Sequence, residues 1–371
     1  MSNGTALSRR NLLRLGALAG AGGLLAACSR PDDAPASAGG SNGPFTTIRS
    51  TATSYIWAPF LVAEKKGYFA EEGLEQKGKV AGQGVVANIV VAGDAEFVVG
   101  SPMDTMKSTA VGQPLISFCG MVTTLATNIV VSAETFEKAG LTDSSTPEQR
   151  GAAMRGMQLA STGVASTPDL LIRYVSSNLG KLDPNKDLKI VPIQGGGSAM
   201  LAAVKNKQID GMAISSPISD QAISDLGMKY LFDMSKDPVQ SLTGFPYIMA
   251  SCKQDFLEKN PEAIASYCRA IQRSLNFIQA EKDEFRDLLA GIFTDIKPEV
   301  FKTAFESNYP IYGTSIVPTP AQYEQAKEFV VTAFEINGGV SEAAAARKIG
   351  FEDTWDAKIA QQAFDKVGTS Y

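Results

Sequence analysis

The sequence predicts an α/β protein whose body has two lobes, each a mainly parallel β-sheet flanked by helices. Three observations predict this architecture. From Phe45 onward, short apolar runs alternate with helical patterns, as they do in βαβ units. The roughly 325 residues after position 44 exceed the usual size of a single hydrophobic core. One order of turn, helix, strand and helix also occurs twice with different residues, which indicates internal duplication.

The N-terminal residues 1–27 are expected to be an export signal. Arg9 and Arg10 begin it, an apolar run follows, and small residues precede Cys28. The run is shorter than the ~20 residues of a membrane-spanning helix. The arginine pair resembles a twin-arginine signal, although the general export route stays open, and residues 25–28 resemble a lipobox. We therefore expect a periplasmic or extracellular lipoprotein, anchored through lipid on Cys28, in either Gram class.

Residues 28–44 are expected to form a flexible tether, because they are rich in Pro, Gly, Ser and Asp and have no apolar periodicity. The whole chain has a net charge of −5. Removal of residues 1–27 would take away three arginines and no acid, which leaves a more acidic body. An acidic body is a poor ligand for nucleic acid, so we expect no nucleic-acid partner.

The strands and helices can be placed from apolar runs and caps. Strands are predicted at 46–53, 96–100, 115–119, 128–132, 157–161, 188–193, 211–215 and 247–251, and the last third is predicted to be mostly helical. A capping side chain precedes a proline, which marks a helix start, at Ser101, Thr167, Ser216, Asn260 and Thr319. Helix ends are predicted at Gly112, Gly180, Gly227 and Gly338.

The duplicated stretch predicts which turns face each other. In the first copy a helix ends near Gly93, a strand runs to Gly100, and Ser101 begins the next helix. In the second copy the strand ends at Ser215 and Ser216 precedes the next helix. Because ligands of open parallel sheets bind at the carboxyl ends of the strands, these turns are expected to share a cleft.

The chain contains no histidine. This absence excludes Ser-His-Asp and Cys-His catalysis and the usual histidine-containing zinc sites, so we expect neither an enzyme nor a metal or cofactor. After Cys28 three cysteines remain, Cys119, Cys252 and Cys268. Burial as small apolar residues is favoured over a disulfide between Cys252 and Cys268, although the pattern leaves that disulfide open.

Candidate ligand-binding residues are the hydroxyl, amide and aromatic side chains that follow strands, begin helices or lie at the crossings between lobes. They are Ser54, Tyr55, Trp57, Gln83, Ser101, Asn128, Ser161, Thr162, Ser166, Ser198, Ser215 and Tyr247. Each hydroxyl also fits a simple helix cap. Trp57 and Phe60 are three residues apart, so both also fit the buried side of a helix.

Residues 55–75, YIWAPFLVAEKKGYFAEEGLE, resemble a segment of the nitrate, sulfonate, taurine and thiamine-pyrimidine binding proteins of ABC importers. Residues 93–102 and 208–213 are similar to later motifs of that family. The resemblance implies a two-lobed, hinged periplasmic-binding-protein fold. Residues 45–127 and 251–371 would form lobe 1, and residues 128–250 the hinge crossings and lobe 2.

The resemblance implies that the protein captures a small-molecule solute between its lobes and delivers it to an ABC permease and its ATPase, as a monomer. Aromatic side chains near the first strand favour an aromatic or heterocyclic solute. A sulfonate or carboxylate held by helix N-termini remains open. Two other functions also remain open: a sensory lipoprotein that reports to a receptor, and, more remotely, an enzyme similar to the thiamine-pyrimidine synthase.

Overall fold

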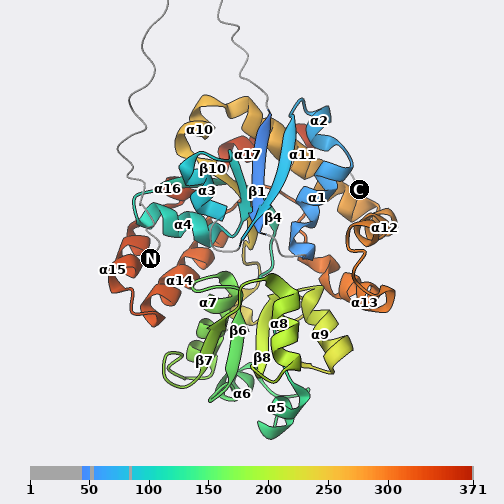
Figure 1. The fold of residues 1–371 in the computed structure, drawn as a ribbon. Helices are drawn as coiled ribbons and strands as arrows, with labels where there is room; N and C mark the ends of the chain where they lie inside the picture. Colours follow the sequence, from blue (N-terminus) through green and yellow to red (C-terminus); the bar gives the residue numbers. More distant parts are fainter. Residues whose placement is uncertain (1–43, 51–53, 83–85, 370–371) are drawn as a thin grey trace, which may run out of the picture. The chain divides into compact units, whose positions relative to one another are not determined.

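The structure is a computed structural model that describes residues 44–50, 54–82 and 86–369 (Figure 1). It contains two five-stranded sheets. Sheet 1 has the order β2 (Gln76–Ala81), β1 (Phe45–Ser50), β3 (Phe97–Gly100), β10 (Ile248–Lys253) and β4 (Leu115–Val122). Sheet 2 has the order β7 (Lys189–Pro192), β6 (Gln158–Ser161), β8 (Gly211–Ser215), β5 (Thr127–Val131) and β9 (Lys229–Phe232). Helices flank both sheets, which confirms the predicted fold class.

The helices follow the strands in an alternating pattern until residue 253, and the remainder is helical. The first group is α1 (Ala58–Lys65), α2 (Tyr68–Glu71), α3 (Val86–Ala92), α4 (Pro102–Ala110), α5 (Ala133–Lys138), α6 (Pro147–Ala152), α7 (Thr167–Tyr174), α8 (Gly196–Lys205) and α9 (Ile218–Leu226). The second is α10 (Gln254–Lys259), α11 (Pro261–Ala280), α12 (Lys282–Ile292), α13 (Pro298–Asn308), α14 (Pro320–Ile336), α15 (Val340–Lys348), α16 (Phe351–Thr354) and α17 (Lys358–Val367). Short 3-10 turns occupy Tyr55–Trp57, Gln240–Leu242 and Tyr309–Ile311, and a π-helical turn at Val175–Leu179 extends α7.

The chain passes from sheet 1 to sheet 2 between β4 and β5 and returns between β9 and β10. Sheet 2 is therefore built from one continuous stretch of chain. The returning strand β10 lies between β3 and β4 and runs antiparallel to both. In sheet 2 the first strand after the crossing, β5, lies antiparallel between β8 and β9.

The two sheets repeat one local device as well as one strand order. The Glu96 carboxylate accepts a hydrogen bond from the Thr46 backbone N–H at 2.7 Å, and the Glu96 N–H donates to the Thr46 carbonyl. The Asp210 carboxylate accepts from the Gln158 N–H at 2.7 Å, and the Asp210 N–H donates to the Gln158 carbonyl. Each acid lies one residue before its strand and joins the start of that strand to the start of the neighbouring parallel strand. This equivalence supports the predicted duplication.

The predicted strands all occur, but the sequence prediction missed β2 and β9. Both are edge strands. Strand β2 has the sequence QKGKVA and is mostly exposed, so it carries no apolar run. Strand β9 is a four-residue strand that begins with Lys229. Edge strands need neither length nor a continuous apolar character, so they leave a weak trace in the sequence.

The predicted helix starts are confirmed at Ser101, whose hydroxyl accepts from the Met103 N–H, and at Thr319, which forms a capping box with Gln322. Two others are wrong by a residue. Ser166, and not Thr167, caps α7, because its hydroxyl accepts from the Asp169 N–H. Pro217 is the N-cap residue of α9, which frees the Ser216 carbonyl for a different partner.

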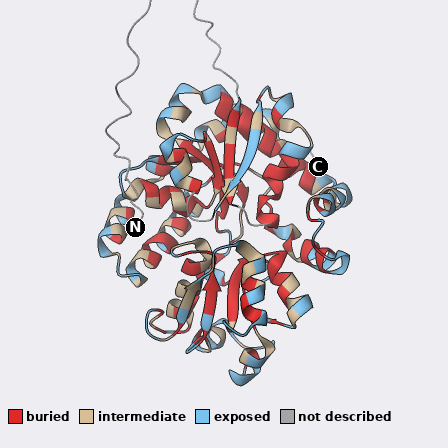
Figure 2. Ribbon diagram, in the orientation of Figure 1, coloured by how far each residue is buried: buried red, intermediate tan, exposed pale blue. Residues whose placement is uncertain are grey.

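Buried residues follow the strands of both sheets (Figure 2), and one large hydrophobic cluster contains residues of sheet 1, of helix α11 and of sheet 2. Phe97, Phe118 and Tyr267 pack with ring centroids 4.8 to 5.9 Å apart. Aromatic contacts of this kind add about 0.5–1.5 kcal/mol per pair beyond the burial of their surface. Cys119, Cys252 and Cys268 are buried free thiols, so the disulfide left open by the sequence is not formed.

The expected export signal at residues 1–27, the lipidation site Cys28 and nearly all of the tether lie outside the described residues, as does Gln83. Among the residues that are described, no helix has the length and apolar character needed to cross a bilayer.

Candidate ligand-binding site

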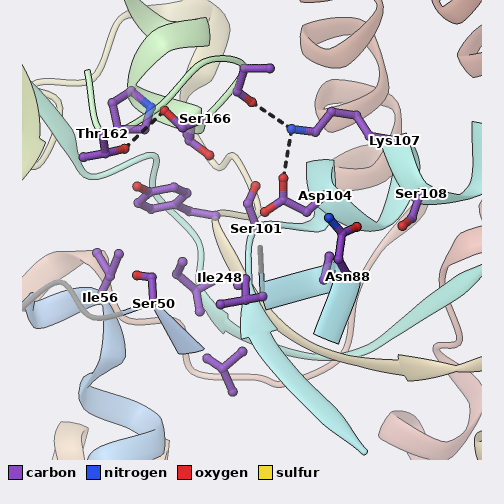
Figure 3. Close-up of a pocket in the computed structure, with 18 of the residues that line it drawn as sticks. Ser50, Ile56, Asn88, Ser101, Asp104, Lys107, Ser108, Thr162, Ser166 and Ile248 are labelled. Atoms are coloured by element: carbon purple, nitrogen blue, oxygen red, sulfur yellow. Dashed lines mark hydrogen bonds and ion pairs between the residues drawn. The ribbon is translucent and has the colours of Figure 1, made fainter. Parts of the chain in front are cut away.

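A cavity of about 380 Å³ lies between residues that follow the strands of both sheets (Figure 3). Sheet 1 contributes Ser50 and Gly100 at the carboxyl ends of β1 and β3. Sheet 2 contributes Ser215 at the end of β8 and Thr162 just after β6. Two parallel strands of each sheet thus end at one cavity, as expected for a ligand site in open parallel sheets.

Seven of the predicted site residues line this cavity. They are Ser54, Trp57, Ser101, Thr162, Ser166, Ser215 and Tyr247. The hydroxyl of Tyr247 lies 2.6 Å from that of Thr127 and 3.5 Å from that of Ser215, at the base of the two crossings. The hydroxyl of Thr162 donates to Ser166 at 3.2 Å (Figure 3). Several of these polar groups therefore bind one another as well as facing the cavity.

Tyr55 and Asn128 were predicted at the site but do not line the cavity. Tyr55 turns away from it, because its ring packs on Phe293 and Phe301 and its hydroxyl donates to the Phe301 carbonyl at 3.3 Å. The Asn128 amide donates to Ser219 at 3.1 Å, and its oxygen accepts from the Ser235 N–H at 3.1 Å. Both side chains therefore stabilise the fold through contacts within the protein.

Ser161 and Ser198 also lie outside the cavity lining. The Ser161 hydroxyl is fully buried and donates to the Gly163 carbonyl at 3.3 Å, so it shapes the turn before α7. Ser198 is an exposed residue in the first turn of α8. The remaining predicted residue, Gln83, cannot be placed, since it falls in the gap at 83–85.

The sequence prediction missed the charged residues of the cavity, Asp104, Lys107 and Glu342. Three lining side chains, two in α4 and one at its C-cap, were predictable from their spacing. Asp104, Lys107 and Val111 follow Ser101 at intervals of three or four residues, so one face of the helix faces the cavity. The prediction considered only strand ends and caps. Residues spaced three or four apart from the cap residue Ser101 lie on one face of the helix, and this spacing would have identified the face.

Lys107 connects the two halves of the site. Its ammonium lies 2.9 Å from the Asp104 carboxylate and donates to the Ala165 carbonyl at 2.8 Å (Figure 3). Ala165 belongs to the loop between β6 and α7, on the side of sheet 2. Near the crossings, the Ser54 hydroxyl and the Tyr55 N–H both donate to the Ser216 carbonyl, at 3.0 and 3.1 Å. The two sides of the cavity are thus in direct contact.

The sequence profile of the NMT1-like family matches residues 52–294, which is more than half of the chain. This chain belongs to the NMT1-like family. The match covers most of sheet 1 and all of sheet 2, including most of the residues that form the cavity.

Other proteins resemble this NMT1-like chain at low identity. YtlA of Bacillus subtilis (strain 168), named as a candidate binding protein, is 23% identical over 78% of this chain and 83% of its own. The periplasmic nitrate-binding protein NrtA from Synechocystis PCC 6803 has a TM-score of 0.64 at 14% identity, covering 88% of this chain and 89% of NrtA. The aliphatic sulphonate binding protein SsuA from Escherichia coli has a TM-score of 0.63 at 15% identity, covering 85% and 92%.

The NMT1-like chain therefore has the fold of the periplasmic binding proteins. A desulfurization enzyme, DszB, shares it as well, with a TM-score of 0.58 at 12% identity over 87% of this chain and 99% of the enzyme. At these identities the likeness shows the fold alone, and the function must be argued from the site.

Burial is the main cause of the shifted pKa values of Tyr247 and Asp220 in this NMT1-like protein. Burial raises the pKa of Tyr247, and its hydrogen bonds with Ser215 and Thr127 partly oppose the effect. Burial also raises the pKa of Asp220 in the first turn of α9, against hydrogen bonds from Ser216 and Tyr230. No group of three or more metal-binding side chains occurs within the described ranges.

Proposed function

We propose that this protein is the solute-binding component of an ABC importer, and that it captures a small organic molecule in the cavity between its two sheets. The observation that carries the proposal is the cavity itself, whose lining comes from both sheets and whose two sides meet through Lys107. A volume of about 380 Å³ lies in the usual range for small-molecule sites, about 300–1,000 Å³.

The moving parts would be the two lobes, residues 45–127 with 251–371 and residues 128–250, joined at the two crossings. A hinged closure needs contacts that exist only in the closed form. The Lys107–Ala165 hydrogen bond and the exposed Lys297–Asp225 ion pair, at 2.8 Å, join residues of different lobes. Solute would favour closure by filling the space between them.

A ring-bearing solute suits the lining. Trp57 and Tyr247 offer aromatic faces, and Ile56, Val99 and Ile248 add apolar surface. Serine and threonine hydroxyls supply the few directional groups that fix a ligand's orientation. This combination supports an aromatic or heterocyclic molecule.

Ligand binding is tested by a thermal-shift screen of the purified protein. A true ligand at about 100 times its Kd stabilises the native state by about 2.7 kcal/mol, which raises the melting temperature visibly. Replacing Trp57 by Ala should abolish the shift while the protein stays folded. Trp355→Phe is the matched control, because Trp355 packs on Tyr323 and Phe351 away from the cavity. Unchanged binding by Trp57→Ala would remove the site from this cavity.

Import and anchoring are tested in cells. A strain without the protein should lose uptake of the labelled ligand, and the wild-type gene should restore it. A strain that keeps normal uptake but loses a transcriptional response to the ligand would favour the sensory function instead. Cys28→Ala should release the protein from the membrane fraction and prevent incorporation of labelled palmitate.

A further inference from the structure

The helices that begin at the cavity carry their own negative charges. A helix N-terminus attracts anions through its free N–H groups and partial positive charge. Ser101 and Ser166, the caps of α4 and α7, line the cavity, and each hydroxyl already accepts a helix N–H. The third residue of each helix is an aspartate, Asp104 in α4 and Asp169 in α7. Both helix starts are therefore largely compensated within the protein.

Asp169 is buried, is paired with Arg173 and does not line the cavity. Its carboxylate accepts from the Ala165 N–H at 3.1 Å and from Arg173 at 3.0 Å, and its side chain is only 3% exposed. Asp104 is different. Its side chain is 38% exposed and faces the cavity, and one oxygen binds the ammonium of Lys107 (Figure 3). Within the described chain no hydrogen bond reaches its second oxygen, which remains able to accept one from a solute.

Lys107 is the one cationic side chain among the described lining residues. Its ammonium is already bound by Asp104 and by the Ala165 carbonyl. Glu342 adds a second carboxylate to the lining, which contains no arginine. The internal gaps at 51–53 and 83–85 contain no charged residue type, so they add no cation. The cavity thus has two carboxylates and a single, already paired, ammonium.

We propose that the cavity rejects anions and selects a solute with a protonated or N–H-donating nitrogen, which donates to the second oxygen of Asp104. This inference rests on the proposed solute-binding function and specifies its substrate class. An anion in the cavity would face uncompensated carboxylate charge without a guanidinium or a free ammonium to bind it. A cationic nitrogen would form a charge-assisted hydrogen bond and restore neutrality beside Lys107.

The test uses probes that share a framework and differ in charge. The whole protein is titrated with an amine, an alcohol and a sulfonate on each of three frameworks. The phenyl set is benzylamine, benzyl alcohol and benzenesulfonate, and the other two sets carry a pyridyl or an ethyl group in place of phenyl. Nitrate is titrated as well. In the Trp355→Phe background Trp57 is the sole tryptophan, so its fluorescence reports on the cavity. We expect the amines to bind at least tenfold more tightly than the sulfonates, and nitrate to leave the fluorescence unchanged.

Asp104→Asn sharpens the test, because it removes the carboxylate and leaves the ammonium of Lys107 uncompensated. Binding of the amines should weaken at least tenfold, and binding of the sulfonates should strengthen. Asp283→Asn is the matched control, since it removes an equal charge from a side chain that is 87% exposed on α12. It should behave as the wild type.

Two results would overturn the inference. The first would refute only the charge selection, and the second would refute the proposed function as well. Sulfonates or nitrate that bind the wild type more tightly than the amines, and lose this binding in Trp57→Ala, would refute the charge selection while leaving solute binding intact. If no probe of any charge class bound at millimolar concentration, and the wider screen also gave no ligand, the proposed function would fail together with the inference.

Discussion

Helices α4 and α9 occupy equivalent places, since α4 follows β3 in sheet 1 and α9 follows β8 in sheet 2. Each has an aspartate as its third residue, yet the two carboxylates differ in environment. Asp104 faces the cavity and binds Lys107. Asp220 is 8% exposed and accepts hydrogen bonds from Ser219 and from the Tyr230 hydroxyl. The shared framework thus places similar groups, and their neighbours decide which group meets a solute.

The largest expected effect concerns Phe97 and Gly211, which follow the equivalent acids Glu96 and Asp210. Phe97 is fully buried among aromatic rings, whereas a Cβ on Gly211 would lie 2.3 Å from the Val130 carbonyl oxygen. Phe97→Ala should lower the free energy of unfolding by about 3–5 kcal/mol through a cavity. Gly211→Ala should lower it by about 1–3 kcal/mol through overpacking. Urea denaturation measures both, and a neutral Gly211→Ala would show that β5 and β8 can separate.

A smaller effect tests whether Glu96 and Asp210 contribute equally to the free energy of unfolding. Glu96→Ala and Asp210→Ala each remove a carboxylate that binds a backbone N–H at 2.7 Å. A hydrogen bond with one charged partner contributes about 1.5–3 kcal/mol, so we expect losses of about 1–2 kcal/mol for these partly exposed groups. Losses that differ by more than about 1 kcal/mol would contradict the equivalence of the two sheets.

The smallest effect is a pH dependence that belongs to Asp220. Burial raises its folded pKa above the unfolded value of about 3.9, so between these values the folded state binds more protons than the unfolded state. The contribution of Asp220 to stability therefore falls as the pH rises through this window. Relative to the wild type, Asp220→Asn should therefore be more stable at pH 7 than at pH 4. A stability difference from the wild type that does not change with pH would contradict this account.

The fold was largely predictable because its strands and caps leave strong local signals. Buried strands such as β4 and β8 are continuous apolar runs, and Ser101 with Pro102 marks a helix start. The missed strand β2 is exposed and polar, since an edge strand obtains its pairing from one neighbour and needs little burial. The wrong cap at Thr167 arose because Ser166 precedes it with the same chemistry.

The site was less predictable because position along the chain does not fix side-chain direction. Tyr55 and Trp57 share one short helical turn, but Trp57 lines the cavity and Tyr55 packs against α13. Only the position of α13, more than two hundred residues later, decides this. Lys107 was missed because the sequence prediction was limited to strand ends and helix caps, although its spacing from Ser101 places it on the cavity face of α4. Its hydrogen bond to Ala165, in the loop between β6 and α7, was not predictable. Contacts between distant segments carry no signal in a single sequence.

The insertion of sheet 2 within sheet 1 also orders the assembly of the protein. All strands of sheet 2 come from a continuous stretch ending at Phe232, so that sheet can be completed as soon as this stretch is available. Sheet 1 must wait for β10, which enters between β3 and β4. Pairing of such distant segments is slow, because a long loop has to close first. The later-encoded sheet should therefore reach its native state before the one that begins the chain.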